Sequence, residues 1–177
     1  MNRLGIVIPM FNEARHIGRT LVAARHAARE AGLDCELVVV DNGSSDDGPR
    51  IAPALGARVL NSPGLSIGAL RNRGAAACDC DWLAFLDADI EVPEHWLSRL
   101  LDLHAQGCGE VFALDCDTPH QAPWFAIAWQ RRTLRAGELM HRQQWLPSPN
   151  LLMPRPWFEQ VGGFDEHLRL SLIHISE

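Results

Sequence analysis

Short runs of consecutive apolar residues alternate along the chain with longer segments in which apolar residues recur every three or four positions. The first pattern is typical of buried strands in a parallel sheet, and the second is typical of helices that cover it. Strands are predicted at residues 4–9, 36–40, 57–60, 82–86 and 111–114. Helices are predicted at residues 12–31, 45–53, 67–77 and 93–104. The alternation indicates an α/β fold with a mostly parallel sheet flanked by helices on both faces.

Residues with special backbone roles mark the expected ends of two of these helices. Asn12 can cap the first helix, and Gly32 is a natural stop for it. Pro93 fits the first position of the last helix, and Gly107 follows that helix. We therefore expect the first helix to begin directly after Asn12 and the last to begin at Pro93.

Polar clusters follow three predicted strands at the point where each strand ends, at residues 12–13, 41–44 and 87–89. In open α/β sheets the ligand lies beyond the carboxyl ends of the strands. We therefore expect the three clusters to meet at one edge of the sheet. A solvated loop explains any one cluster, but it explains three clusters at the same edge less well.

The composition limits the class of protein. A chain of 177 residues with 47% hydrophobic and 21% charged residues is ordinary for one soluble domain. The net charge of -6 argues against a nucleic-acid partner, which would require a basic face. It leaves room for a phosphorylated ligand, because a metal ion or one local arginine can supply positive charge.

The five cysteines lie within apolar stretches, and their number is odd. Both facts favour free thiols in a cytoplasmic protein over a disulfide framework. Cys78 and Cys80 form a Cys-x-Cys pair with no second pair near it. A zinc site is therefore not expected there.

Three features of the chain suggest the chemistry of a site. Asp87 and Asp89 follow a buried strand, and two neighbouring carboxylates favour a hard divalent cation such as Mg²⁺ or Mn²⁺. Arg71 lies among small residues, where its guanidinium could bind diphosphate oxygens, or it could be a surface arginine that pairs with Asp or Glu. Asp41 could accept hydrogen bonds from a base or ribose, or it could cap the next helix together with Ser44.

Five motifs occur in order: IVIPMFNE (6–13), VVVDNGSSDDG (38–48), GLSIGALRNRG (64–74), FLDADIEVP (85–93) and VGGFDE (161–166). Together they resemble the family-2 glycosyltransferases of GT-A fold over residues 4–170. The resemblance implies a Rossmann-like nucleotide-binding half at residues 1–106 and part of an acceptor-binding half at residues 107–170. It also implies an enzyme that transfers a hexosyl-type sugar from a nucleoside-diphosphate sugar, with uridine favoured as the base.

The resemblance also implies roles for individual residues. The nucleotide side would comprise Pro9, Asn12, Glu13, Asp41, Asn42, Ser44, Arg71 and Asp87. Asp89, with Asp87, would hold Mn²⁺ or Mg²⁺ on the diphosphate. The acceptor side would comprise Asn150, Gly162, Gly163 and Asp165.

The implied mechanism inverts the anomeric carbon and needs a carboxylate base to take the acceptor's proton. Family members usually supply it from a Glu-Asp pair shortly after the GGFDE motif. In this chain the expected base is absent after Leu170, and residues 171–177 read SLIHISE. We therefore predict that the chain is truncated and that this tail is anomalous. Asp165 or Glu177 could replace the base, although no pattern favours either, and the alternative function is nucleotide-sugar binding without transfer.

Other enzyme classes fit the sequence less well. A haloacid-dehalogenase-type phosphatase would carry its Asp-x-Asp after the first strand, and a dinucleotide dehydrogenase would carry Gly-x-Gly-x-x-Gly there. A sugar nucleotidyltransferase shares the general fold and metal, but it would show a glycine-rich basic loop at that point. The first strand is followed instead by FNEARHIG, residues 11–18.

The remaining predictions concern partners and location. No apolar run approaches the roughly 20 residues that span a bilayer, so a cytoplasmic protein is expected. Residues 123–140 combine aromatic side chains with Arg131, Arg132 and Arg135. These aromatics could pack onto the sheet, or the segment could contact the inner face of an anionic membrane. The expected acceptor is a saccharide or a lipid-linked molecule.

Overall fold

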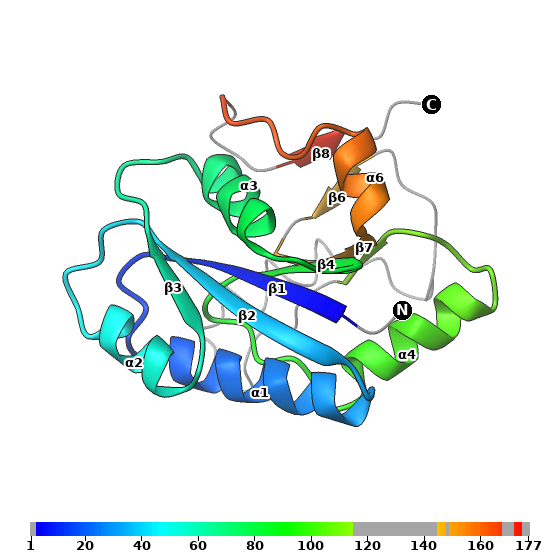
Figure 1. Cartoon of the computed structure of the whole chain (residues 1–177), viewed down its shortest axis with the longest axis horizontal. Helices are drawn as coiled ribbons and strands as arrows, with labels where there is room; N and C mark the ends of the chain where they lie inside the picture. The colour runs from blue at the N-terminus through cyan, green and yellow to red at the C-terminus, as the bar shows by residue number, and fades with distance from the viewer. Residues whose placement is uncertain (1–2, 115–144, 148, 168–171, 175–177) are drawn as a thin grey trace, which may run out of the picture.

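The computed structural model describes residues 3–114, 145–147, 149–167 and 172–174. Its centre is a six-stranded sheet with the order β3-β2-β1-β4-β7-β5 (Figure 1). The strands are β1 (Arg3–Met10), β2 (Asp34–Asp41), β3 (Arg58–Asn61), β4 (Trp82–Leu86), β5 (Phe112–Ala113) and β7 (Asn150–Pro154). A separate two-stranded sheet pairs β6 (Trp145–Pro147) with β8 (Leu172–His174).

The predicted mostly parallel sheet is confirmed. β1 pairs in parallel with β2 and β4, and β2 pairs in parallel with β3. β7 is antiparallel to β4 and β5, with Leu86 opposite Asn150. The apolar pattern did not predict β7, β6 or β8. Residues 172–174 of the suspected anomalous tail pair with residues 145–147, and this pairing does not test the origin of the tail.

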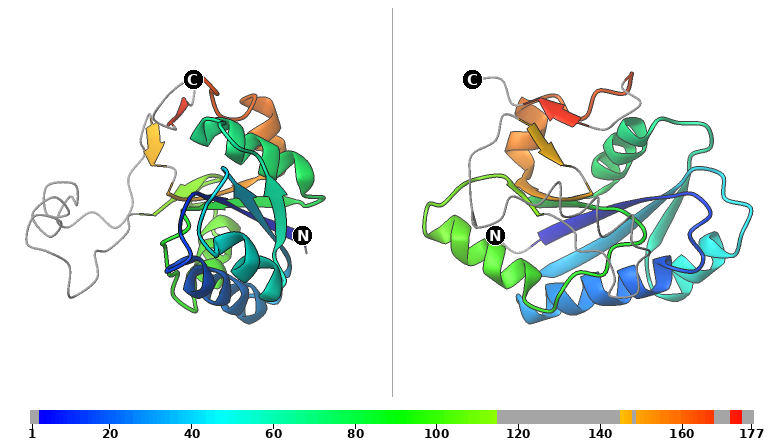
Figure 2. Two further views of the ribbon diagram at one scale, coloured as in Figure 1. Left: turned by 90° about the vertical axis from the view of Figure 1, so that its left-hand side faces the viewer. Right: turned by 180° about the vertical axis from the view of Figure 1, so that it is seen from behind.

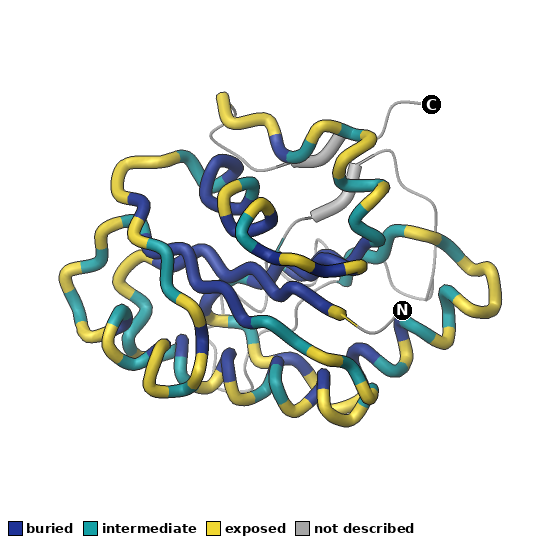
Figure 3. The backbone as a smooth tube through the Cα atoms, viewed as in Figure 1, coloured by how far each residue is buried: buried dark blue, intermediate teal, exposed yellow. Residues whose placement is uncertain are grey.

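Helices cover both faces of the sheet, as predicted (Figure 2). α1 (Ile17–Glu30), α2 (Gly48–Ala54) and α4 (Trp96–Ala105) lie on one face. α3 (Ile67–Ala77) and α6 (Arg155–Gln160) lie on the other. Side chains alternate across each strand, so Ile6 and Ile8 of β1 point toward the layer of α1, α2 and α4. Val7 points toward the second helical layer, which is formed by α3 and α6. Figure 3 shows that the central strands are the buried part of the chain.

The helix ends were predicted with mixed success. Gly32 and Gly107 adopt positive φ angles of 66° and 74° just beyond α1 and α4, as expected for helix stops. The predicted starts were wrong. α1 begins at Ile17, because Asn12 has a φ of 56° and its side chain bonds a different loop. α4 begins at Trp96, whose backbone N–H bonds the carbonyl of Pro93 across a turn.

Among the described residues, no helix is both long and apolar enough to cross a membrane. The segment 123–140, for which membrane contact was predicted, lies outside the described residues. Its two interpretations therefore remain predictions.

Candidate functional site

The loops that follow β1 and β2 are joined by hydrogen bonds at the carboxyl edge of the sheet. The backbone N–H of Asn12 donates to Oγ of Ser44 at 2.9 Å, and the N–H of Ser45 donates to Oδ1 of Asn12 at 2.8 Å. Two residues further on, the N–H of Ala14 donates to Oδ2 of Asp46 at 2.8 Å. Two of the three predicted polar clusters therefore meet, as the strand order required.

Asp41 ends β2 and is almost fully buried, with 4% of its surface exposed. Its carboxylate accepts hydrogen bonds from the N–H groups of Gly43 and Ser44, and from the Ser44 hydroxyl at 2.5 Å. These bonds hold the loop after β2. The interpretation of Asp41 and Ser44 as a cap of the next helix is wrong, because α2 begins at Gly48 with Asp47 at its N-cap. A second role of Asp41 in binding a base or ribose is compatible with holding the loop and remains a prediction.

Two further residues of the predicted nucleotide side connect this loop to its neighbours. The N–H of Asn42 donates to the carbonyl of Met10 at 2.9 Å, and its side chain exchanges hydrogen bonds with the backbone of Leu65. Pro9 is buried in β1 beside Val40 of β2. The loops after β1, β2 and β3 are thereby tied together around the same edge.

Arg71 lies in α3 with 2% of its side chain exposed, so the predicted surface position is wrong, although the pairing with an acidic residue that went with it is confirmed. Its Nη2 donates to Oδ1 of Asp87 at 2.6 Å, and its guanidinium carbon lies 5.4 Å from the centre of the Phe164 ring. Burial lowers the pKa of Arg71, and Asp87 opposes this change. The side chain of Arg71 thus extends from α3 and places its positive charge at the end of β4.

The third polar cluster is close to the first one. Burial raises the pKa of Asp87 above its ordinary value, the Arg71 guanidinium opposes the rise, and Asp89 and Glu13 add to it. Glu13 is in turn hydrogen-bonded to Nδ1 of His16 at 2.7 Å. Carboxylates from the ends of β1 and β4 therefore act on one another. Oxygen ligands of this kind suit a hard divalent cation.

The GGFDE turn is attached to α3 by Asn72, a residue to which the sequence assigned no role. The amide of Asn72 donates to the carbonyl of Phe164 and accepts from its N–H, both at 2.9 Å. Gly162 and Gly163 have φ angles of 80° and 79°, which favour glycine. A Cβ at Gly163 would also lie 2.7 Å from Oδ1 of Asn72. The two glycines let the turn approach α3 closely.

The residues predicted for the acceptor side lie at two places. Asn150 begins β7 with 5% of its surface exposed, and the carbonyl of its neighbour Pro149 accepts from the N–H of Asp87 at 3.0 Å. Asp165 is exposed, and its carboxylate accepts from the N–H of His167 at 2.8 Å. The structure therefore brings Asn150 next to Asp87. Asp165 is the residue after Phe164, whose ring contacts Arg71.

The point at which the expected base is missing from the sequence falls outside the described residues. Leu170 belongs to residues 168–171 and Glu177 to residues 175–177, and neither range is among the described ones. The predicted truncation after Leu170 and the possible role of Glu177 as a base therefore remain predictions. Asp165 is the candidate base that the structure does describe.

The sequence matches the model of glycosyl transferase family 2 over residues 5–170. The chain belongs to this family. The predicted family and fold are confirmed, and family membership favours the glycosyltransferase interpretation over the phosphatase, dehydrogenase and nucleotidyltransferase interpretations.

Relatives of this family-2 chain include an undecaprenyl-phosphate 4-deoxy-4-formamido-L-arabinose transferase of Pseudomonas syringae. It is 32% identical over 112 residues, which cover 59% of this chain and 33% of the relative. The chain spans between 33% and 47% of the length of the first two curated relatives that it matches.

Two solved structures show the same GT-A fold. Staphylococcus aureus TarS in complex with UDP-GlcNAc has a TM-score of 0.69 and 15% identity, with coverage of 95% of this chain and 50% of TarS. The mannosyltransferase PcManGT of Pyrobaculum calidifontis, in complex with GDP-Man and Mn²⁺, has a TM-score of 0.67 and 16% identity. The match covers 94% of this chain and 48% of PcManGT.

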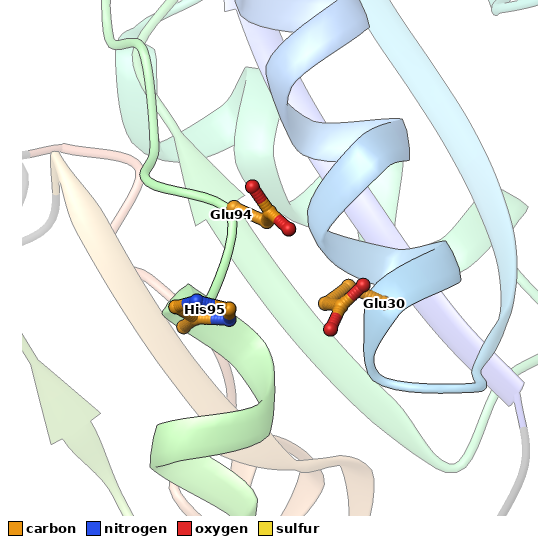
Figure 4. Close-up of side chains that lie close together, drawn as sticks. All are labelled: Glu30, Glu94 and His95. Carbon is orange, nitrogen blue, oxygen red and sulfur yellow. The ribbon is translucent and has the colours of Figure 1, made fainter.

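One group of side chains of types that can ligate a metal lies on other elements of the family-2 domain. Glu30, Glu94 and His95 come together where α1 ends and α4 is about to begin (Figure 4). All three are exposed. This group differs from the predicted metal pair, Asp87 and Asp89, in both its residues and its elements.

Proposed function

We propose that this family-2 domain binds a nucleoside-diphosphate sugar at the carboxyl edge of its sheet and transfers the sugar, with inversion, to an acceptor hydroxyl. The observation that carries the proposal is that the hydrogen-bonded loops of Asn12, Asp41 and Ser44 and the Arg71–Asp87 pair all lie at this edge, beyond the ends of the neighbouring strands β1, β2 and β4. Open α/β sheets bind ligands at this place. Residues 1–106 would form the nucleotide-binding half and residues 107–170 part of the acceptor-binding half.

The nucleotide would lie against the loops that hydrogen bonds join. Asp41 has acceptor atoms for a base or ribose, and Asn12, Asn42 and Ser44 hold the loop around it. Pro9 and Glu13 would complete the base and ribose side, and Arg71 would face the base or diphosphate. We propose uridine as the base because the family resemblance favours it; TarS was solved with UDP-GlcNAc and PcManGT with GDP-Man, so the two fold neighbours do not choose between the bases.

A divalent cation, Mn²⁺ or Mg²⁺, fits the carboxylates at the end of β4. Asp89 is exposed and available, whereas Asp87 already accepts from Arg71 through Oδ1. We therefore assign the main ligand role to Asp89 and a smaller share to Asp87. When bound, the cation would neutralise charge on the departing diphosphate. The Mn²⁺ complex of PcManGT supports this assignment.

The acceptor would approach from the side of β7 and the GGFDE turn. Asn150, Gly162 and Gly163 lie on that side, and Asp165 is the described carboxylate that we propose as the base candidate. A base there would take the proton of the acceptor hydroxyl as it attacks. The acceptor is a saccharide or a lipid-linked molecule, and the undecaprenyl-phosphate relative supports the second class.

Calorimetry with UDP tests the donor and metal assignments together. UDP is titrated with and without Mn²⁺ into the wild type and into Asp89→Ala. We expect Mn²⁺ to tighten UDP binding in the wild type and to have little effect in the variant. Asp102→Ala, which removes an exposed carboxylate from α4, is the matched control. Equal affinities in all four main titrations would contradict the metal assignment.

Turnover separates transfer from binding alone. The wild type and Asp89→Ala are incubated with UDP-sugars and Mn²⁺, and the release of UDP is measured with and without candidate acceptors. Release of UDP by the wild type, and its loss in Asp89→Ala, would support a transferase. Tight UDP binding without release would support the alternative, a module that binds nucleotide sugar without transferring it.

A further inference from the structure

Two thiols lie side by side at the end of the sheet opposite the candidate site. Cys78 and Cys80 belong to the connection between α3 and β4, with 4% and 6% of their surfaces exposed. Both sulfurs pack over Gly5 of β1, where a Cβ would lie 2.8 Å from Sγ of Cys78 and 2.9 Å from Sγ of Cys80. Any other residue at position 5 would displace the pair, so the glycine lets both sulfurs occupy one small space.

A guanidinium group faces this pair. Nη1 of Arg155, the first residue of α6, lies 3.7 Å from Sγ of Cys80. The same nitrogen donates to the carbonyls of Ala75 at 3.1 Å and Cys78 at 3.2 Å. Arg155 reaches the thiols because Pro154, at the end of β7, pairs with Trp82 of β4. The cation is therefore held at the sulfur by the sheet register and by two backbone carbonyls.

The two sulfurs have different acid–base properties. The neighbouring Cys78 thiol lowers the pKa of Cys80 to about 7, Arg155 and the backbone of Gly5 act in the same direction, and burial opposes them. The Cys80 sulfur and burial raise the pKa of Cys78 above its ordinary value. Sγ of Cys78 also lies 3.3 Å from the carbonyl oxygen of Gly74. One sulfur is thus suited to be a thiolate nucleophile and the other to remain a thiol beside it.

We propose that Cys78 and Cys80 form an oxidation site that hydrogen peroxide converts into an intramolecular disulfide. The Cys80 thiolate attacks one peroxide oxygen and the O–O bond breaks. The departing hydroxide takes a proton and leaves as water. The sulfur of Cys78 then attacks the sulfenic acid on Cys80, the S–O bond breaks, and a second water leaves with the Cys78 proton. Two thiols and one peroxide give one disulfide and two waters.

The surroundings make the site selective for a small oxidant. Only a few per cent of the surface of either cysteine is exposed, which disfavours a bulky disulfide reagent, and we therefore choose hydrogen peroxide as the oxidant. Cys108, by contrast, is exposed. We therefore expect Cys80 to react with peroxide before Cys108, because the thiolate is the reactive form. This proposal is independent of the proposed sugar transfer.

Mass spectrometry of the whole chain tests the oxidation. The background variant carries Cys108→Ser and Cys116→Ser, and it is treated with hydrogen peroxide, then unfolded and alkylated. We expect the peptide that contains residues 78 and 80 to lose two hydrogen atoms and to escape alkylation. In Cys78→Ser the same treatment should leave a sulfenic acid on Cys80 that dimedone traps. Oxidation of Cys108 in the wild type shows that the peroxide is active. If the Cys78–Cys80 disulfide fails to form under the same conditions, the proposal is overturned.

The pH dependence of the rate tests the role of Arg155. With the wild-type pair, oxidation should rise with a midpoint near the lowered pKa of Cys80. Arg155→Gln should move that midpoint to higher pH and slow oxidation at neutral pH by up to about tenfold for each pH unit by which the midpoint rises, with recovery at alkaline pH. Arg50→Gln, which removes an exposed guanidinium paired with Asp47, is the control. Equal midpoints in all three proteins would overturn the role given to Arg155.

Discussion

Nη2 of Arg71 lies 2.6 Å from Oδ1 of Asp87, and the two partners are buried to different degrees. The Arg71 side chain is 2% exposed, whereas the Asp87 side chain is 37% exposed. The pair therefore joins the buried face of α3 to the partly exposed end of β4. A buried guanidinium keeps its charge, so it needs a carboxylate within reach.

Removing the charge of Asp87 should destabilise the fold more than removing a surface partner. Asp87→Asn leaves the buried Arg71 with a weaker partner, and we expect a loss of about 1–3 kcal/mol in the free energy of unfolding. Asp47→Asn breaks the exposed pair with Arg50 at 2.9 Å and should cost about 0–1 kcal/mol. Urea unfolding of both variants gives the comparison. Equal losses would show that burial of Arg71 does not strengthen the pair.

Close packing of α3 against the sheet makes Gly74 intolerant of a side chain. A Cβ there would lie 2.2 Å from Cγ1 of Val7 and 3.0 Å from Cγ2 of Val40. Gly74→Ala should therefore cost about 1–3 kcal/mol, although alanine is the better helix former. In α1, Gly18→Ala meets nothing closer than 3.7 Å and should be neutral or stabilising. Thermal unfolding measures both, and a stabilising Gly74→Ala would contradict the prediction.

Binding of UDP should depend on Asp41 if this residue recognises the base or ribose. We expect Asp41→Ala to weaken UDP binding by about 1–3 kcal/mol, because a buried hydrogen-bond partner of the ligand is left unpaired. Calorimetry measures the change, and circular dichroism checks the fold. Asp46→Ala is the control, because it removes a loop hydrogen bond to Ala14 and leaves the Asp41 carboxylate. Equal losses of UDP affinity in the two variants would show that Asp41 only holds its loop in place.

Contact with lipid is a testable property of residues 123–140, which combine aromatic residues with arginines. We expect the protein to co-sediment with anionic vesicles at low ionic strength and to dissociate as salt screens its charges. Arg131→Ala, Arg132→Ala and Arg135→Ala together should reduce this binding. The control variant replaces three arginines of the described part by alanine: Arg15, Arg19 and Arg29. A wild type that ignores anionic vesicles at low salt would favour a soluble acceptor.

Local patterns predicted the parts of the fold that local forces form. β1, β2 and β4 were found from apolar runs, and Gly32 and Gly107 were found from their place after periodic segments. The strand order then required the loops after β1 and β2 to meet, and Asn12 and Ser44 do so. Prediction failed for β7, whose role depends on antiparallel pairing with β4, a strand far earlier in the chain.

The sequence by itself determined the family, the alternation of strands and helices, and the residues that line the carboxyl edge. Only the tertiary structure decided how those residues are used. It bonded Asn12 to the loop at Ser45 and not to a helix as its cap, buried Arg71 against Asp87, and used Asn72 to attach the GGFDE turn. The reason is that hydrophobic periodicity is a local property of the chain, whereas a polar side chain takes its partner from whichever distant segment the packing brings within hydrogen-bond distance.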